Sequence, residues 1–266
     1  MQPYPHRLFL GTSAWTHKDW VGNFYPANTT PRTYLSEYAK RLTSVEIDST
    51  FYAIPKATVV EGWREKTPDS FVFAAKFPKT ITHEKRLIDC QEEVAAFVEV
   101  MSLLGPKLGP LLLQFPVTFQ AHEFDTLARF LDSLPDGFRY AVEVRHHSWL
   151  DTQFFDCLRE HGVAFALVDS PWLPRTVITT TDFTYIRWMG DRNEPFTDFS
   201  RIRLDRSEDL QWWANQVLQM QQADIGIYGY FNNHYAGHSP STLEKFLDYY
   251  RQIQSAEEGA AATTLA

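Results

Sequence analysis

Cysteine is scarce in this sequence of 266 residues, in which Cys90 and Cys157 are the only two. Their spacing is not that of a metal-binding cluster, and each falls at or within a predicted helix without a nearby base that would make it a nucleophile. We therefore interpret both as packing residues. Two isolated cysteines, and an N-terminus that does not resemble a secretion signal, favour a reducing cytoplasm.

Long hydrophobic runs are also missing. Even the apolar segment 108–116 is only as long as a strand, whereas a membrane-spanning helix needs about 20 apolar residues. We therefore expect a soluble protein without a membrane partner.

Positive charge is in short supply as well, because the formal net charge is −8. Binding to the phosphate backbone of nucleic acid needs clustered lysine and arginine, so the sequence disfavours a nucleic-acid partner. A local basic pocket for a small anion remains compatible with this composition. Hydrophobic residues make up 44% and aromatic residues 15% of the chain, which indicates a globular protein.

Apolar, strand-like segments alternate with amphipathic, helix-like segments along the chain. The expected strands cover residues 7–13, 44–50, 71–77, 108–114, 140–147, 163–169, 183–189 and 226–234. Strands separated by helices pair in parallel through right-handed crossovers, and eight such units close most economically into a TIM-type (β/α)8 barrel. A doubly wound open sheet is the rival architecture, but no glycine-rich phosphate-binding fingerprint follows the first strand.

The domain organisation follows from this pattern. We expect one barrel domain over residues 1–254 and a disordered tail, rich in alanine, glutamate and threonine, over residues 255–266. Residues 171–182 contain two prolines and a β-branched run. They predict an irregular crossover between strands six and seven, where a regular barrel has a helix.

Charged residues stand at the ends of strands that otherwise appear buried in the pattern. They are Glu46 and Asp48, Lys76, Glu143 and Arg145, and Asp169. A buried charge needs a partner, so packing alone does not explain these positions. Side chains alternate between the two faces of a strand, and we expect this alternation to bring these groups, with Gln114, Arg187 and Asn232, to the C-terminal mouth of the barrel, where barrel active sites are built.

Several kinds of chemistry fit such a cluster. Glu46 and Glu143 are candidates for the paired carboxylates of a glycosidase. A divalent metal is a second alternative, through ligands among Glu46, Asp48, Glu143, Asp169, His146, His234 and His238. No HExxH motif is present, and the neighbouring cations compete for the same carboxylates, so we predict no cofactor and no defined metal site.

Lys76, Arg145 and Arg187 instead favour an anionic ligand, because guanidinium grips carboxylate or phosphate through paired hydrogen bonds. Aromatic residues in the predicted mouth loops could stack on a ligand or seal the barrel as a hydrophobic lid; they are Trp15, Trp20, Tyr25, Phe51, Tyr52, Trp149 and Trp172. A satisfied salt-bridge network without chemistry is the structural alternative.

Ordered motifs along nearly the whole chain resemble the YecE-like family, also called domain of unknown function 72. They are GTSAW from Gly11, WVGNFYP from Trp20, VEIDSTFY from Val45, KFP from Lys76, ITH ending at His83, LLLQFP, AVEVRHHSW and YFNNHYAGHSP. The resemblance implies a TIM-type barrel and leaves the reaction open. It also singles out Thr82, His83, His146, Asn233 and His238.

Two positions depart from the family pattern. Ala14 stands where a glycine is frequent, and Asp48 where an asparagine is frequent. The second departure adds a negative charge to the expected pocket.

We therefore expect an enzyme that acts on a small polar, anionic compound, phosphorylated or carboxylated, by acid/base chemistry, with hydrolase and lyase as the candidate classes. The expected catalytic residues are Glu46, Asp48, His83 and Glu143. The expected substrate-binding residues are Trp15, Tyr52, Lys76, Gln114, Arg145, His146, Asp169, Arg187, Asn232, Asn233 and His238. A metal-assisted or glycosidase-like hydrolase, and a non-enzymatic ligand-binding or interaction module, are the alternatives. The oligomeric state is not predicted.

Overall fold

Eight parallel strands form a closed barrel in the computed structural model, which describes residues 8–191 and 196–264. The strands are β1 (Leu8–Thr12), β2 (Ser44–Ile47), β3 (Val72–Lys76), β4 (Leu108–Gln114), β5 (Tyr140–Glu143), β6 (Ala164–Asp169), β7 (Phe183–Trp188) and β8 (Gly226–Phe231). Each strand pairs with the next, and β8 pairs with β1. The predicted TIM-type (β/α)8 barrel is therefore confirmed.

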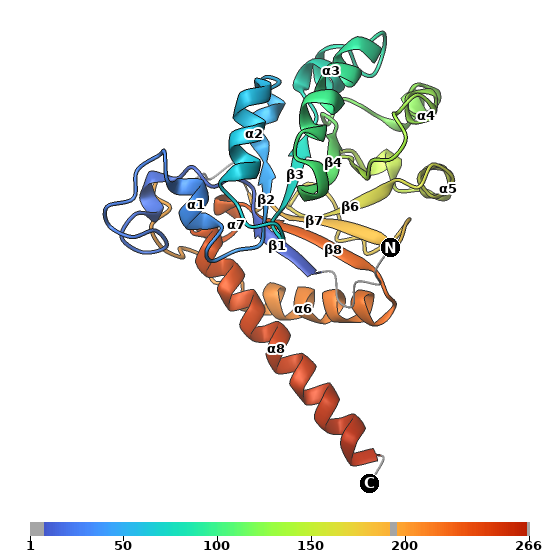
Figure 1. Ribbon diagram of the computed structural model, residues 1–266. Helices are drawn as coiled ribbons and strands as arrows, with labels where there is room; N and C mark the ends of the chain where they lie inside the picture. The colour runs from blue at the N-terminus through green and yellow to red at the C-terminus, as the bar shows by residue number, and fades with distance from the viewer. Residues whose placement is uncertain (1–7, 192–195, 265–266) are drawn as a thin grey trace.

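Helices surround the strands (Figure 1). They are α1 (Tyr34–Tyr38), α2 (Ala57–Glu65), α3 (Gln91–Ser102), α4 (Phe124–Asp132), α5 (Thr152–Glu160), α6 (Ser207–Gln222), α7 (Asn233–Ala236) and α8 (Ser239–Thr264). Their apolar faces pack on the outside of the barrel in one continuous core. Asp151 is the N-cap of α5, because its side chain accepts a hydrogen bond from the Phe154 backbone N–H at 2.8 Å.

The crossover between β6 and β7 is irregular, as predicted. Residues 170–182 form turns and extended segments without a helix. The Thr180 hydroxyl accepts from the Phe165 backbone N–H at 2.8 Å and donates to the Val163 carbonyl at 2.7 Å. This side chain ties the crossover to the edge of the barrel, where a helix would otherwise pack.

The predicted tail is wrong for residues 255–264, which form the last turns of α8. In Figure 1 this helix runs beside α6 and continues past the barrel. Gln222 of α6 donates a hydrogen bond to Glu257 of α8 at 2.6 Å. Alanine, glutamate and glutamine are good helix formers, so a composition that suggests disorder also extends a helix that is already nucleated. Residues 265 and 266 lie outside the described residues.

The barrel interior has an apolar part toward the N-terminal ends of the strands and a polar part toward their C-terminal ends. The apolar part mixes small and aromatic side chains: Ala74, Leu112, Ala141, Ala164, Ala166, Phe183, Tyr185, Tyr228 and Tyr230. The small residues leave room for the rings of the opposite strands, which is how a barrel of eight strands fills its centre. The Tyr230 and Ser44 hydroxyl groups lie 2.9 Å apart and begin the polar part.

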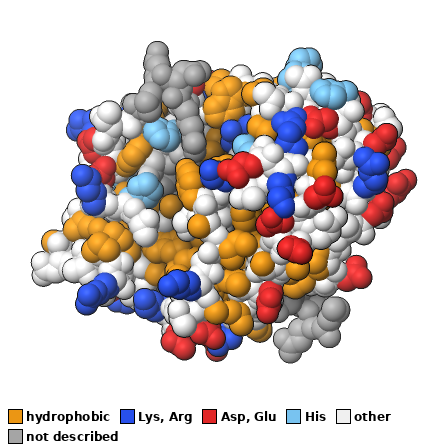
Figure 2. Space-filling view, turned by 90° about the horizontal axis from the view of Figure 1, so that it is seen from above, with side chains coloured by type: hydrophobic (Ala, Val, Ile, Leu, Met, Phe, Trp, Pro, Cys, Tyr) orange, Lys and Arg blue, Asp and Glu red, His pale blue; other side chains and the backbone are white. Residues whose placement is uncertain are grey.

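Among the helices within residues 8–191 and 196–264, none has both the length and the apolar composition to cross a bilayer. The face shown in Figure 2 intersperses lysine and arginine with aspartate and glutamate, with hydrophobic side chains between them.

A glycine at the contact of β1 and β2 provides a test of the barrel packing. A Cβ on Gly11 would lie 1.9 Å from the Ser44 carbonyl oxygen and 2.9 Å from the Tyr38 hydroxyl. We expect Gly11→Ala to lower the free energy of unfolding by at least about 2 kcal/mol, because the strands must separate to admit a methyl group. Gly62→Ala in α2 is the control, since its Cβ would meet no atom within 4 Å, and it should stabilise by about 0.5–1 kcal/mol. Urea unfolding of both variants makes the comparison, and a neutral Gly11→Ala would contradict the packing.

Candidate active site

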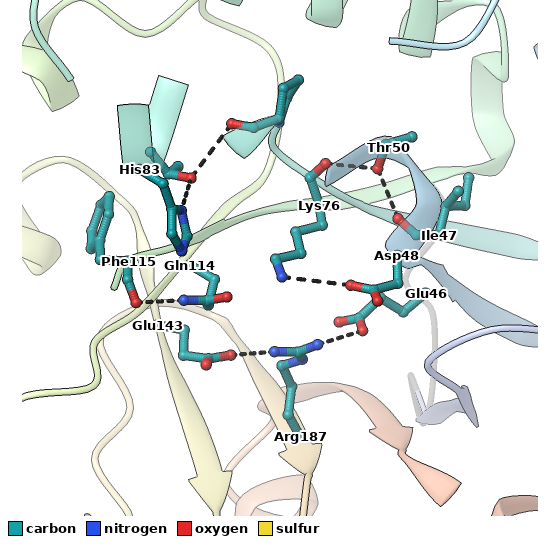
Figure 3. A network of polar contacts seen from close by, with 12 residues as sticks. Glu46, Ile47, Asp48, Thr50, Lys76, His83, Gln114, Phe115, Glu143 and Arg187 are labelled. Atoms are coloured by element: carbon teal, nitrogen blue, oxygen red, sulfur yellow. Dashed lines mark hydrogen bonds and ion pairs between the residues drawn. The ribbon is translucent and has the colours of Figure 1, made fainter. Parts of the chain in front are cut away.

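Arg187 lies at the centre of the polar part of the barrel. Its guanidinium donates from Nη1 to Glu143 Oε2 at 2.6 Å and from Nη2 to Glu46 Oε1 at 2.8 Å (Figure 3). The three side chains come from β7, β5 and β2, and each is at most 1% exposed. One cation thus joins two buried carboxylates across the barrel, and the carboxylates raise the pKa of Arg187 well above its usual value against the effect of burial.

Tyr185 completes the shell of Glu46. Its hydroxyl donates to Glu46 Oε2 at 2.6 Å, so both oxygens of this carboxylate hold donors. Burial and the Glu46 charge raise the pKa of Tyr185 well above its usual value, which keeps the hydroxyl protonated as a donor. Sequence reasoning missed Tyr185. The period of two that places Phe183 and Arg187 on one face of β7 could have identified it.

Arg145 provides a second guanidinium for Glu143. Its Nε donates to Glu143 Oε1 at 3.1 Å, and its guanidinium carbon lies 5.3 Å from the centre of the Trp172 ring. Burial alone would raise the pKa of Glu143, but the charges of Arg187 and Arg145 outweigh it and lower the pKa to about 2. Glu143 is therefore ionised at any ordinary pH, while Arg145 remains 26% exposed at the mouth.

Lys76 is the third cation of the group. Its Nζ lies 3.5 Å from Asp48 Oδ1 and 3.8 Å from the centre of the Phe51 ring. Burial, and then the charge of Arg187, lower the pKa of Lys76 to about 8. At neutral pH the amine is mostly protonated, and a minor neutral fraction exists.

The local backbone explains how these groups meet. Asp48 and Phe51 belong to a short 3-10 helix, η2 (Asp48–Phe51), which follows β2 directly. The Thr50 hydroxyl lies 2.7 Å from the Lys76 carbonyl and 2.8 Å from the Ile47 carbonyl and shares its proton between them (Figure 3). This tie holds the turn after β2 against the end of β3, so that a carboxylate and an aromatic face flank the Lys76 ammonium.

His83 and Gln114 border the same group. His83 lies in a single π-helical turn, η3 (Thr80–Glu84), with Nδ1 2.8 Å from the Thr82 hydroxyl and its ring edge-on to Phe51. Burial and the charges of Lys76 and Arg145 lower the pKa of His83 to about 4, so its ring is neutral at pH 7. Gln114 pairs in register with Glu143 and donates to the Phe115 carbonyl.

The structure therefore brings together most of the strand-end residues selected from the sequence: Glu46, Asp48, Lys76, His83, Gln114, Glu143, Arg145 and Arg187. Others are placed elsewhere. Asp169 follows the alternation of β6 to the face opposite Ala164 and Ala166, which line the interior. Its carboxylate accepts from Trp213, Tyr235 and Arg175 in the outer layer, so it does not join the group.

The predicted residues that follow β5 and β8 form contacts within turns. Asn232 caps α7 by accepting from the His234 N–H, and Asn233 accepts from the Ser239 N–H and hydroxyl. His146 Nδ1 accepts from the Ser148 N–H and His238 Nδ1 from the Ser241 N–H. These contacts shape loops around the barrel.

Trp15 and Tyr52, the two aromatic residues among the expected substrate-binding residues, differ in their exposure. Trp15 is buried and packs edge-on against Trp63, whereas Tyr52 is exposed beside Phe51. Of the pair, only Tyr52 is accessible to a ligand.

Metal-ligand geometry is not found in the described part of the chain, where no group of three or more His, Cys, Asp or Glu side chains is placed to hold an ion. The contacts give a local reason at this site. Arg187 occupies the space between Glu46 and Glu143 that a cation would need, and these carboxylates already hold four donors.

Known proteins match most of this chain in sequence. A family model described as protein of unknown function DUF72 matches residues 9–264. The UPF0759 protein YecE of Escherichia coli (strain K12) is 44% identical over 240 residues, covering 81% of this chain and 82% of that protein. The UPF0759 protein YunF of Bacillus subtilis (strain 168) is 24% identical and covers 91% of this chain and 94% of that protein.

Solved structures agree. A DUF72 family protein from Thermotoga maritima MSB8 superposes with a TM-score of 0.78 at 29% identity, covering 94% of this chain and 100% of that one. A DUF72 family protein from Enterococcus faecalis V583 has a TM-score of 0.75 at 23% identity, covering 92% and 95% of the two chains. These names assign no reaction.

The central position of Arg187 predicts a large loss of stability when its charge is removed. We expect Arg187→Met to lower the free energy of unfolding by about 3–5 kcal/mol, because two buried carboxylates lose their partner. Tyr185→Phe, which removes one hydrogen bond to Glu46, should cost about 1–2 kcal/mol. The exposed pair Arg251 and Asp248 gives the control, since Arg251→Met should change stability by no more than about 0.5 kcal/mol. Equal effects of Arg187→Met and Arg251→Met in urea unfolding would contradict this assignment.

The lowered pKa of Glu143 predicts that acid destabilises the wild type more than it destabilises Glu143→Gln. Its pKa falls from 4.5 to about 2 on folding, so its contribution to stability is present above pH 4.5 and is lost as the pH falls toward 2. Glu143→Gln lacks this titration. We expect the stability gap between wild type and Glu143→Gln to be largest near pH 6 and to narrow steadily below pH 4.5. Unfolding midpoints from pH 3 to pH 7 measure the gap, and a constant gap would refute the lowered pKa.

Proposed function

This chain belongs to the family of protein of unknown function DUF72, and from that premise we propose that its barrel mouth binds a small anionic compound and transfers a proton on it. One observation carries the proposal: after Arg187 has neutralised the buried carboxylates, the partly exposed Arg145 and the buried Lys76 remain incompletely paired. Cations in that state favour an anionic guest.

Arg145 is the anion-binding residue in this account. Only its Nε is hydrogen-bonded to a side chain among the described residues, which leaves both terminal nitrogens for a carboxylate or a phosphate. The Trp172 ring, whose centre lies 5.3 Å from the guanidinium carbon, and the Nε bond to Glu143 together restrict the orientation of the guanidinium. A guanidinium held in one plane binds a two-oxygen face with paired hydrogen bonds.

Lys76 and Asp48 are the proton-transferring residues. A general acid or base works best when its pKa is near the working pH, and the pKa of Lys76 is lowered to about 8. Asp48 lies beside it and is 33% exposed, so it can exchange protons with solvent. This revises the roles expected from the sequence. Glu143, with a pKa of about 2, orients the two guanidiniums and does not supply a proton.

The alternatives from the sequence are less favoured. A glycosidase needs one carboxyl group held protonated as the acid, whereas Glu143 is ionised and both oxygens of Glu46 accept hydrogen bonds. A metal-assisted hydrolase would need Arg187 to leave its two carboxylates. A ligand-binding module without turnover shares the anion site proposed here and lacks the proton transfer.

Phosphate binding tests the anion site. We expect Arg145→Gln to weaken the binding of inorganic phosphate at pH 7 by at least about tenfold, the equivalent of about 1.4 kcal/mol, because the paired hydrogen bonds are lost. Arg159→Gln on α5 is the control, since Arg159 is exposed and forms an ion pair with Asp156 on the same helix. Isothermal titration calorimetry measures both affinities. Unchanged phosphate affinity in Arg145→Gln would rule out the proposed site.

The pH dependence of binding tests the role of Lys76. In the wild type, the affinity for sulfate, which stays a dianion between pH 7 and pH 9, should fall as the pH rises through about 8, because Lys76 loses its proton there. In Lys76→Arg the side chain keeps its charge over this range, so its affinity should stay level between pH 7 and pH 9. The same calorimetric titration at four pH values makes the comparison. A wild-type affinity that is level across this range would exclude Lys76 from the site.

A further inference from the structure

Two lysines of the chain are buried to the same extent and differ in their surroundings. Lys76 and Lys107 are each 6% exposed. Lys107 Nζ lies 2.7 Å from the Arg64 carbonyl, 2.7 Å from the Thr67 carbonyl and 3.4 Å from the Thr67 hydroxyl. Its three N–H bonds all have acceptors, so its ammonium is held as a structural cation.

Among the described residues, Lys76 has no such shell of acceptors. Its Nζ has one carboxylate oxygen, at 3.5 Å from Asp48, and the face of the Phe51 ring. An aromatic face attracts a cation but leaves its N–H bonds without hydrogen-bond acceptors. The neutral amine of Lys76, which carries a nucleophilic lone pair, is therefore within reach.

The neighbouring charges favour the same outcome. Arg187, beside the Lys76 side chain, lowers its pKa together with burial. Arg145 contacts Glu143, Arg187 joins Glu143 to Glu46, and Lys76 lies beside Asp48, so both cations border the same ion-pair network. A ligand whose anionic group rests on Arg145 would extend along this network toward Lys76.

We propose that Lys76 is a nucleophile that forms a covalent imine with a small carbonyl compound carrying a carboxylate, of the 2-oxo acid class. This inference rests on the proposed anion site, because Arg145 holds the carboxylate. Burial, an unsatisfied amine and a proton acceptor within reach are the features that activate a lysine for imine formation.

The reaction balances with the groups present. The Lys76 ammonium first gives one proton to solvent. Neutral Nζ then attacks the carbonyl carbon, the C–N bond forms, and the carbonyl π electrons move to oxygen, which takes a proton back from solvent. The nitrogen gives a proton to Asp48, and this carboxyl returns it to the hydroxyl group as the C–O bond breaks and water leaves. The product is an iminium ion, with no change in oxidation state and no further reactant.

The site is suited to the iminium charge. The Phe51 ring and Asp48 lie beside Lys76 Nζ, the atom that becomes the positive nitrogen. Both groups stabilise a cation. An iminium also acidifies the neighbouring C–H bonds, which gives the proton transfer of the proposed function a target.

Borohydride trapping tests the imine. The full-length protein is incubated with pyruvate or glyoxylate, reduced with sodium borohydride and mapped by peptide mass spectrometry. We expect reduced adducts on Lys76 at least about tenfold above those on Lys107 and on the exposed Lys40. Acetone, which lacks a carboxylate, should label Lys76 far less, and phosphate should compete with pyruvate.

Variants separate this inference from the anion site. Lys76→Arg should lose the adduct, because a guanidinium does not form the imine, and Arg145→Gln should lower pyruvate labelling of Lys76 in parallel with phosphate affinity. Absence of a Lys76 adduct with both 2-oxo acids overturns the imine, and labelling of Lys76 no greater than that of Lys40 does the same. If phosphate binding still depends on Arg145 in that case, the proposed anion site stands alone. If Lys76 is labelled but Arg145→Gln changes neither readout, the anion site fails instead.

Discussion

The bridge from Arg187 to Glu46 and Glu143 is the constraint on which the site depends. Two carboxylates inside a barrel repel each other and lose hydration, and a single guanidinium that donates to both removes each cost at once. Such a buried network adds little net stability compared with an apolar core. What it provides is geometry, since it locks side chains from β2, β5 and β7 at one level of the barrel.

The bridge also determines which charges remain for a ligand. Three carboxylates, Glu46, Asp48 and Glu143, face three cations, but the deepest pairs satisfy one another first. Among the charged side chains that the structure describes, Arg145 pairs only with Glu143, through Nε, and Lys76 only with Asp48, at 3.5 Å. The group is therefore neutral as a whole, and its least completely paired members are two cations. This division of charge connects the buried ion pairs to anion binding, to the lowered pKa of Lys76 and to its reactivity.

Much of this arrangement could be predicted from single strands, because alternation is a local property. Glu46, Glu143 and Arg187 were correctly expected to share a space, and the two prolines of the β6–β7 crossover predicted its lack of a helix. Long-range partners were beyond such reasoning. Asp169 was misplaced because it lies on the outer face of β6, where Trp213 and Tyr235 from distant segments satisfy it. Likewise, the sequence could not show that Arg187, and not a ligand, would occupy both carboxylates, or that α8 would continue beside α6.

The most direct test of this account is the pKa of Lys76, measured by following its Cε resonance in 13C-labelled protein as the pH is raised. The account predicts a midpoint of about 8, which moves upward when phosphate is added because a bound anion stabilises the ammonium. A midpoint near the ordinary 10.5, unchanged by phosphate, would contradict it.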